Sequence, residues 1–304
     1  MSRLIHRYAA LPHAFQMSRA TITVFVEGRE TDSYVYGRLC AEVVDPRLNP
    51  FAIHIMRADE LPQVGSGGKD ILVALFKYLR DRAALSKSGS YTTLFFLDKD
   101  LDEIDRKKLR SQHVVYTPTY DVEGLIFLHG NVADAAAAAL SMPPTDPFGI
   151  GPTSSWCISR AQNWMEWIAL CLTSRHLAAG IADYGSPSRV NDPLHGPADP
   201  LLIGTIQTQI SSRTGVSLPK VIDMYGRKLA KVRKLLREDR ISTVFKGKWY
   251  FDVLRSDVVS THARFANTAG FHNAIRSALI VNLDYKAEWA KTFRDRVSIL
   301  TASV

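Results

Sequence analysis

Two apolar stretches decide the fold: TITVFV at residues 21–26 and YTTLFFL at residues 91–97. Both are rich in β-branched and aromatic residues, and neither contains a charged residue. Such an unbroken apolar run is typical of a strand buried on both faces, as in a parallel sheet. Acidic residues follow at once: Glu27 after the first run, Asp98 and Asp100 after the second.

Further strands and helices alternate with these two runs. FAIHIM at residues 51–56 and VVY at residues 114–116 are expected strands, and residues 32–44 and 69–84 have the apolar spacing of helices. This alternation predicts an α/β fold, with a parallel sheet flanked by helices. A Pro- and Gly-rich segment at residues 142–155 interrupts it. We therefore expect an α/β domain at residues 1–140 and a mostly helical domain at residues 141–304.

Composition narrows the class of protein. The 304 residues carry a formal net charge of +8, which suits a polyanionic partner such as a nucleic acid. The three cysteines form no Cys-x-x-Cys pair, which argues against a disulfide framework or a zinc site. The sequence has no run of 18 apolar residues, so it predicts no membrane span. The arginine-containing first 20 residues look somewhat like a transit peptide, but we interpret them as a lead-in to the first strand of a cytoplasmic protein.

Acidic residues at the ends of apolar runs are the strongest chemical signal. Glu27, the pair Asp98 and Asp100, and Glu123 are all expected at strand ends. The carboxyl ends of parallel strands line one edge of a sheet, so these acids can converge. On extended backbone Asp98 and Asp100 point to the same side, and carboxylates are ligands that Mg²⁺ prefers. The alternative is that these acids merely occupy turns, which favour aspartate.

These motifs resemble a known family. ITVFVEG (residues 22–28) followed by LFFLDKD (residues 94–100) is similar to the two signatures of the Toprim family, the catalytic domain of topoisomerases, primases and OLD-type nucleases. GSGGKD (65–70), TYDVEGLIF (119–127) and KGKWYFDVL (246–254) resemble a Toprim-like branch of bacterial proteins of unknown function. Some members are encoded beside an ABC-type ATPase as anti-phage effectors, as in the PARIS-type system. The resemblance covers residues 20–130 and, beyond them, only KGKWYFDVL.

The resemblance implies a Toprim-like, Rossmann-like domain with nuclease activity that depends on Mg²⁺, with Mn²⁺ as an alternative. It implies that Glu27 binds metal or acts as general acid or base, that Asp98 and Asp100 ligate the ion, and that Glu123 binds a second ion or orients the first. Relatives often place an aspartate four residues after the glutamate. Here Asp32 comes one position later, which leaves its role open. The implied partners are tRNA or DNA and an ABC-type ATPase subunit, and a homodimer is left open.

Basic residues supply candidate contacts to a substrate. Lys69 follows Gly67 and Gly68 and could reach a phosphate at the start of a helix, although a plain turn explains the glycines equally well. The segment is not a Walker A loop, so the chain is not expected to hydrolyse ATP alone. A basic helix is expected at residues 221–240, and Lys246 and Lys248 follow it. This region suits a nucleic-acid backbone, a solvated helix face or an acidic partner.

Two other functions remain open from the sequence. The acids could be a remnant or a structural cation site in a non-catalytic binding or scaffold subunit. A primase-like nucleotidyl transferase is the third alternative. The tryptophans Trp156, Trp164 and Trp167 have near-helical spacing and are expected in a core or an interface rather than in a base-binding site.

Overall fold

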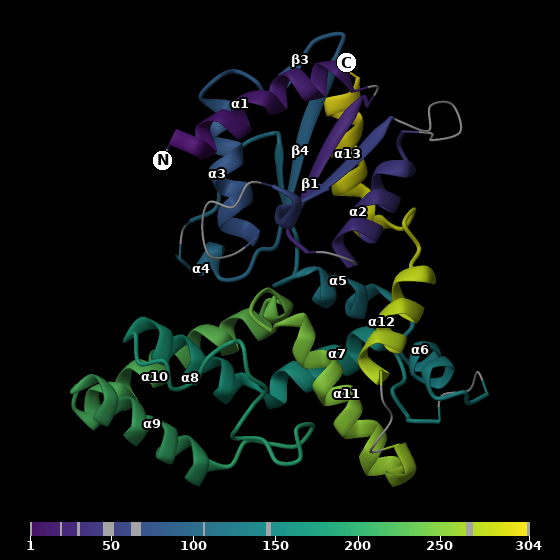
Figure 1. Ribbon diagram of the computed structural model, residues 1–304. Coiled ribbons are helices and arrows are strands. Elements are labelled where there is room, and N and C mark those ends of the chain that lie inside the picture. Colours follow the sequence, from purple (N-terminus) through teal and green to yellow (C-terminus); the bar gives the residue numbers. More distant parts are fainter. Residues whose placement is uncertain are drawn as a thin grey trace. The chain divides into compact units, whose positions relative to one another are not determined.

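A computed structural model describes residues 2–18, 20–28, 31–44, 52–61, 68–105, 107–143, 147–265 and 270–302. The chain divides into two compact units, Met1–Thr117 with Asp284–Val304, and Pro118–Leu283 (Figure 1). These bounds differ from the expected 1–140 and 141–304. The helices α5 (Val122–His129) and α6 (Val132–Ala139) pack on later helices, and α13 (Lys291–Thr301) returns to the first unit.

The first unit contains the predicted sheet. Its strands are β1 (Ile22–Val26), β2 (Ile53–Arg57), β3 (Ser86–Lys87), β4 (Tyr91–Leu97) and β5 (Val114–Tyr116). Strand β1 lies between β2 and β4 and is parallel to both, while β4 also pairs in parallel with β5. Only the short β3, among the described strands, is antiparallel to its neighbour β4. The predicted α/β fold with a parallel central sheet is therefore confirmed.

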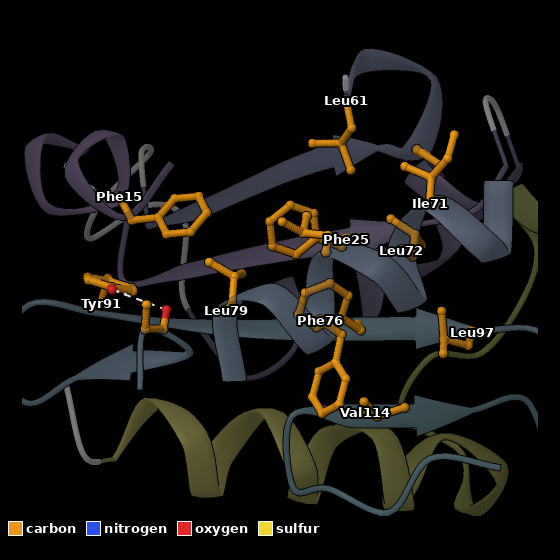
Figure 2. Close-up of a cluster of buried hydrophobic side chains, with 14 residues drawn as sticks. Phe15, Phe25, Leu61, Ile71, Leu72, Phe76, Leu79, Tyr91, Leu97 and Val114 are labelled. Atoms are coloured by element: carbon orange, nitrogen blue, oxygen red, sulfur yellow. Dashed lines mark hydrogen bonds between the residues drawn. The ribbon is translucent and has the colours of Figure 1, made fainter. Parts of the chain in front are cut away.

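Period-two alternation along β4 places its side chains on the two faces of the sheet. On one face Phe95 stacks on Phe25 at 4.6 Å between ring centroids and meets Phe76 of α3 (Gly68–Arg80) edge-on. Figure 2 shows this cluster between α3 and the strands. On the other face Phe96 stacks on Tyr36 of α2 (Thr31–Ala41) at 4.1 Å and lies 5.9 Å from Phe293 of α13. Helices thus cover both faces, as the apolar strands require.

The segment before β1, which we expected as a lead-in to that strand, forms the helix α1 (Ser2–Met17). Its Phe15 is buried and lies 6.0 Å from Phe25 and 5.4 Å from Tyr91, ring centroid to ring centroid. The first unit also contains α4 (Asp102–Asp105) and the 3₁₀ turns η1 (Ala58–Glu60) and η4 (Glu288–Ala290).

The second unit is helical. Besides α5 and α6 it contains α7 (Thr153–Asn163), α8 (Met165–His176), α9 (Pro200–Thr214), α10 (Leu218–Arg237), η2 (Ile241–Thr243), α11 (Gly247–Thr261), η3 (Ala263–Phe265) and α12 (Phe271–Val281). Trp156, Trp164 and Trp167 are buried in it, which confirms their predicted place in a core. Among the described residues, every helix is too short or too polar to cross a bilayer.

The aromatic contact between β1 and β4 provides a test of this core. Phe95 is fully buried, and replacing it with alanine leaves a cavity beside Phe25 and Phe76. We expect Phe95→Ala to lower the free energy of unfolding of the first unit by about 3–5 kcal/mol. Native-state hydrogen exchange of the β1 and β4 amides measures this unit by itself. The control Lys77→Ala, on the exposed face of α3, should change it by less than about 0.5 kcal/mol, and equal losses would contradict the packing.

Candidate functional site

The parallel register of β1 and β4 brings the predicted acids together. Phe25 is opposite Phe95, so Glu27 and Asp98 follow the two strands at the same edge of the sheet. The Asp98 backbone N–H donates a hydrogen bond of 2.8 Å to Oε1 of Glu27. The Glu27 carboxylate thus contacts the backbone of a residue 71 positions away, so both predicted residues lie at one edge of the sheet. That their carboxylates share an ion stays a prediction.

Glu27 has an unusual acidity in this position. Loss of solvent through burial raises the pKa of its carboxyl from 4.5 to about 8, although Lys69 opposes the shift. The nearby carboxylates of Asp100 and Asp32 raise the pKa further, and the hydrogen bond from Asp98 lowers it. Glu27 is therefore mostly protonated at pH 7 in the absence of another cation.

Lys69 is the cation of this cluster. Its ammonium group, at the start of α3, donates hydrogen bonds to the backbone oxygen of Asp98 and to Oδ2 of Asp100, the latter at 2.9 Å. It also lies 2.9 Å from Oδ2 of Asp102. The three ammonium protons thus have three oxygen acceptors. Burial lowers the pKa of Lys69, but Asp100, Asp102 and Glu27 raise it more, so the group remains charged.

The start of α3 approaches the end of β1 very closely. A Cβ atom on Gly68 would lie 3.0 Å from the backbone oxygen of Glu27, which explains the need for a small residue there. Gly65, Ser66 and Gly67 of the predicted phosphate-binding turn lie outside the described residues. Lys69 itself points to acidic groups, and its predicted contact with a substrate stays a prediction.

The backbone after β4 departs from the expected extended conformation. Asp100 has a φ of +45°, in the left-handed region, so the chain turns there. The expectation of extended backbone is therefore wrong at Asp100, and whether the Asp98 and Asp100 carboxylates face one ion stays a prediction. Their shared feature is instead Lys69, which binds the backbone oxygen of the first and the carboxylate of the second.

Two neighbouring aspartates complete the cluster. Asp32, whose role the sequence leaves open, accepts a hydrogen bond of 2.7 Å from the backbone N–H of Gly28 and is buried. Asp102 was missed in the sequence analysis, although it is the third acid in the alternating stretch DKDLD at residues 98–102. Its ion pair with Lys69 makes it a member of the cluster.

Glu123 belongs to the second unit and does not follow a strand, contrary to expectation. It lies in the first turn of α5, because Asp121 caps that helix through a hydrogen bond of 2.9 Å from the Gly124 N–H. Asp121 also accepts from the Gly247 N–H at 2.9 Å, so it joins the starts of α5 and α11. Burial, and secondarily Glu123, raise the pKa of Asp121 well above its ordinary value.

This contact joins the stretches TYDVEGLIF and KGKWYFDVL in the structure. A Cβ atom on Gly247 would lie 2.0 Å from the backbone nitrogen of Gly124, so only glycine fits. Lys246 donates to the backbone oxygen of Tyr184 at 2.8 Å, which fixes the loop before α9, whereas Lys248 is exposed. The predicted roles of Lys246, Lys248 and Glu123 at a substrate or metal stay predictions.

The donor set is chemically suited to a hard cation, since it consists of carboxylate oxygens around a partly buried point. Nevertheless, no group of three or more His, Cys, Asp or Glu side chains in the described ranges is placed to share a metal ion. The position between Asp100 and Asp102 is taken by the Lys69 ammonium group. A divalent ion would therefore require these side chains to rearrange around it.

No family model, curated protein or solved structure matches this chain. Its similarity to the Toprim family therefore consists of the short motifs ITVFVEG and LFFLDKD and the further stretches named with them. The site has to be judged on its own chemistry.

The raised pKa of Glu27 predicts a pH dependence of stability. Between pH 4.5 and about 8 the folded protein retains a proton that the unfolded chain has lost. The free energy of unfolding should therefore fall as pH rises through this window, by about 1.4 kcal/mol per pH unit at most for this one group. Glu27→Gln has no such proton and should lack this slope in urea unfolding at pH 5–8. Glu288→Gln, at an exposed position in the same unit, should retain it. Parallel curves for wild type and Glu27→Gln would contradict the assignment.

Gly247 offers a second test, on the second unit. Gly247→Ala forces the starts of α5 and α11 apart, and we expect a loss of about 3 kcal/mol in thermal unfolding. Gly226→Ala is the matched control, because Gly226 lies in α10 with open space around it. That change should stabilise the helix by up to about 1 kcal/mol. A neutral Gly247→Ala would show that the close approach is not required.

Proposed function

We propose that the first unit carries an Mg²⁺-dependent nuclease site of the Toprim type, which cleaves phosphodiester bonds of a nucleic acid. The observation that carries the proposal is the hydrogen bond from the Asp98 backbone N–H to the Glu27 carboxylate, which joins the ends of two parallel strands at the carboxyl edge of the sheet. Ligand sites of open α/β sheets lie at this edge.

Each acidic residue has a proposed role at this site. Glu27, Asp98 and Asp100 would hold Mg²⁺, or Mn²⁺ in its place, with Asp102 beside them. When bound, the ion polarises a phosphoryl oxygen and lowers the pKa of a water molecule. If Glu27 does not ligate the ion, its raised pKa of about 8 suits it instead to exchange a proton with the attacking or leaving oxygen near neutral pH.

Lys69 would change partners when the ion binds. In the structure its ammonium group contacts the carboxylates of Asp100 and Asp102 and the backbone oxygen of Asp98. Displaced from Asp100 and Asp102, the same ammonium group would remain at the edge of the sheet and would be available to a substrate phosphate.

The biological setting belongs to the same proposal. The Toprim resemblance supports an effector of anti-phage defence that acts on tRNA or DNA in the cytoplasm under the control of an ABC-type ATPase subunit. A homodimer, and a second ion held by Glu123, are further parts of this proposal.

A non-catalytic binding subunit is the second candidate. The Lys69 ammonium group favours this candidate, because it already balances the charge of the Asp100 and Asp102 carboxylates without a metal ion. A buried ion-pair network of this kind can serve a structural purpose alone. A primase-like nucleotidyl transferase would use the same acids and differs in needing nucleotides as substrates.

Purified protein incubated with tRNA, single-stranded DNA or duplex DNA decides among these functions. We expect cleavage with Mg²⁺ or Mn²⁺ that EDTA abolishes, and a decrease of at least about 100-fold in Glu27→Gln, Asp98→Asn and Asp100→Asn. Asp81→Asn, an exposed acid in the same unit, should retain full activity. Circular dichroism verifies that each variant is folded.

The other outcomes each favour one alternative. Binding without cleavage under any metal favours the binding subunit. Extension of a primer from nucleotides favours the transferase. Cleavage that survives all three substitutions contradicts the proposed site.

A further inference from the structure

A short segment of the second unit holds most of the excess positive charge of the protein. Residues 227–240 contain seven basic and two acidic residues, a net charge of +5, against +8 for the whole chain. The basic residues are Arg227, Lys228, Lys231, Arg233, Lys234, Arg237 and Arg240. The preceding helix α9, which packs on α10, has Arg213 as its single charged residue. Most of the excess charge therefore lies in α10 and the turn that follows it.

Helix α10 exposes this charge on one side. It buries Val221, Leu229 and Val232 and packs on α8. Arg227, Lys231 and Lys234 follow each other at i, i+4 and i+7, so they share the exposed face, and Arg233 and Arg237 flank them. We call these five residues the α10 basic face. At 1.5 Å per residue it extends over about 15 Å.

Internal ion pairs do not account for the α10 basic face. Arg227 pairs with Asp223, Lys234 lies 3.7 Å from Glu238, and Arg233 lies 3.9 Å from Glu166. All three basic side chains are exposed, and such pairs contribute little. Lys231 and Arg237 have no ion pair within the described part of the chain. Two pairs of like charges lie four residues apart on the helix: Arg227 with Lys231, and Arg233 with Arg237. Such pairs destabilise a helix. A ligand of opposite charge would relieve this repulsion.

The form of the face favours a nucleic-acid backbone over an acidic protein. Stable protein interfaces have an apolar centre, whereas residues 227–240, all of them described, include no large exposed hydrophobic side chain. The exposed Leu218 and Ile222 of α10 precede this stretch. A row of lysines and arginines matches a row of phosphates, and each contact releases condensed counterions.

We propose that the α10 basic face binds the phosphate backbone of a nucleic acid without regard to sequence. The inference rests on the proposed function for its substrate class, since it gives the nuclease site a surface that holds the same polymer. It extends that function by assigning substrate affinity to the second unit and chemistry to the first.

Binding measured without catalysis tests this surface. Fluorescence anisotropy with labelled tRNA and a labelled single-stranded DNA, in EDTA, excludes any contribution from cleavage. We expect the quadruple variant Arg227→Gln, Lys231→Gln, Lys234→Gln, Arg237→Gln to raise Kd by at least about 10-fold and to reduce the slope of log K against log[salt] by about 3. The variant Arg227→Lys, Lys231→Arg, Lys234→Arg, Arg237→Lys keeps the charges and should bind as the wild type does.

The matched control removes the same charge elsewhere. Arg80, Arg82, Lys87 and Arg110 are exposed residues of the first unit, and their joint change to glutamine should alter Kd by less than about 2-fold. Equal effects of the two glutamine variants would overturn the inference, because net charge alone would then explain binding. Loss of heparin binding with unchanged nucleic-acid binding would overturn it too.

The outcome is separable from that of the nuclease. Weakened binding by the α10 variant supports the surface even if no cleavage is ever seen. Unchanged binding, together with metal-dependent cleavage that Glu27→Gln abolishes, overturns the surface and leaves the nuclease site intact.

Discussion

The parallel pairing of β1 with β4 is the constraint on which the site depends. The stacked rings of Phe25 and Phe95 lie in register across the two strands, and hydrogen bonding of the strands fixes their relative position along the sheet. A shift by one residue would turn every side chain of a strand to the opposite face. Because the register holds, Glu27 and Asp98 reach the same edge and come into contact.

Once the acids are gathered, their charge has to be balanced. The protein does so in two ways, by a proton on Glu27, whose pKa is raised by burial, and by the ammonium group of Lys69. Both are cations that a divalent ion could replace, since it bears two charges and prefers the same oxygens. The same contacts are equally consistent with a permanent ion-pair network, and for that reason only metal-dependent chemistry separates the two candidate functions.

The sequence predicts what depends on local pattern. The strand YTTLFFL was expected at residues 91–97 and is found there, and the contact between Glu27 and Asp98 follows from strand order. The turn at Asp100 was not predicted, because its left-handed φ has no signature in a single aspartate. The grouping of α5 with α11 could not be foreseen either, since it depends on a contact between Asp121 and Gly247, 126 residues apart.

Lysines and arginines show most clearly why sequence patterns alone do not assign roles. In the sequence Lys69, Lys246 and the cations of α10 look alike, as basic residues near acids or glycines. In the structure Lys69 contacts carboxylates and Lys246 donates to the Tyr184 backbone oxygen, so both contact groups of the protein itself. The α10 basic face is instead exposed to solvent, where its charges repel one another. A phosphate backbone relieves that repulsion along the whole row, whereas isolated exposed ion pairs relieve it only at single positions.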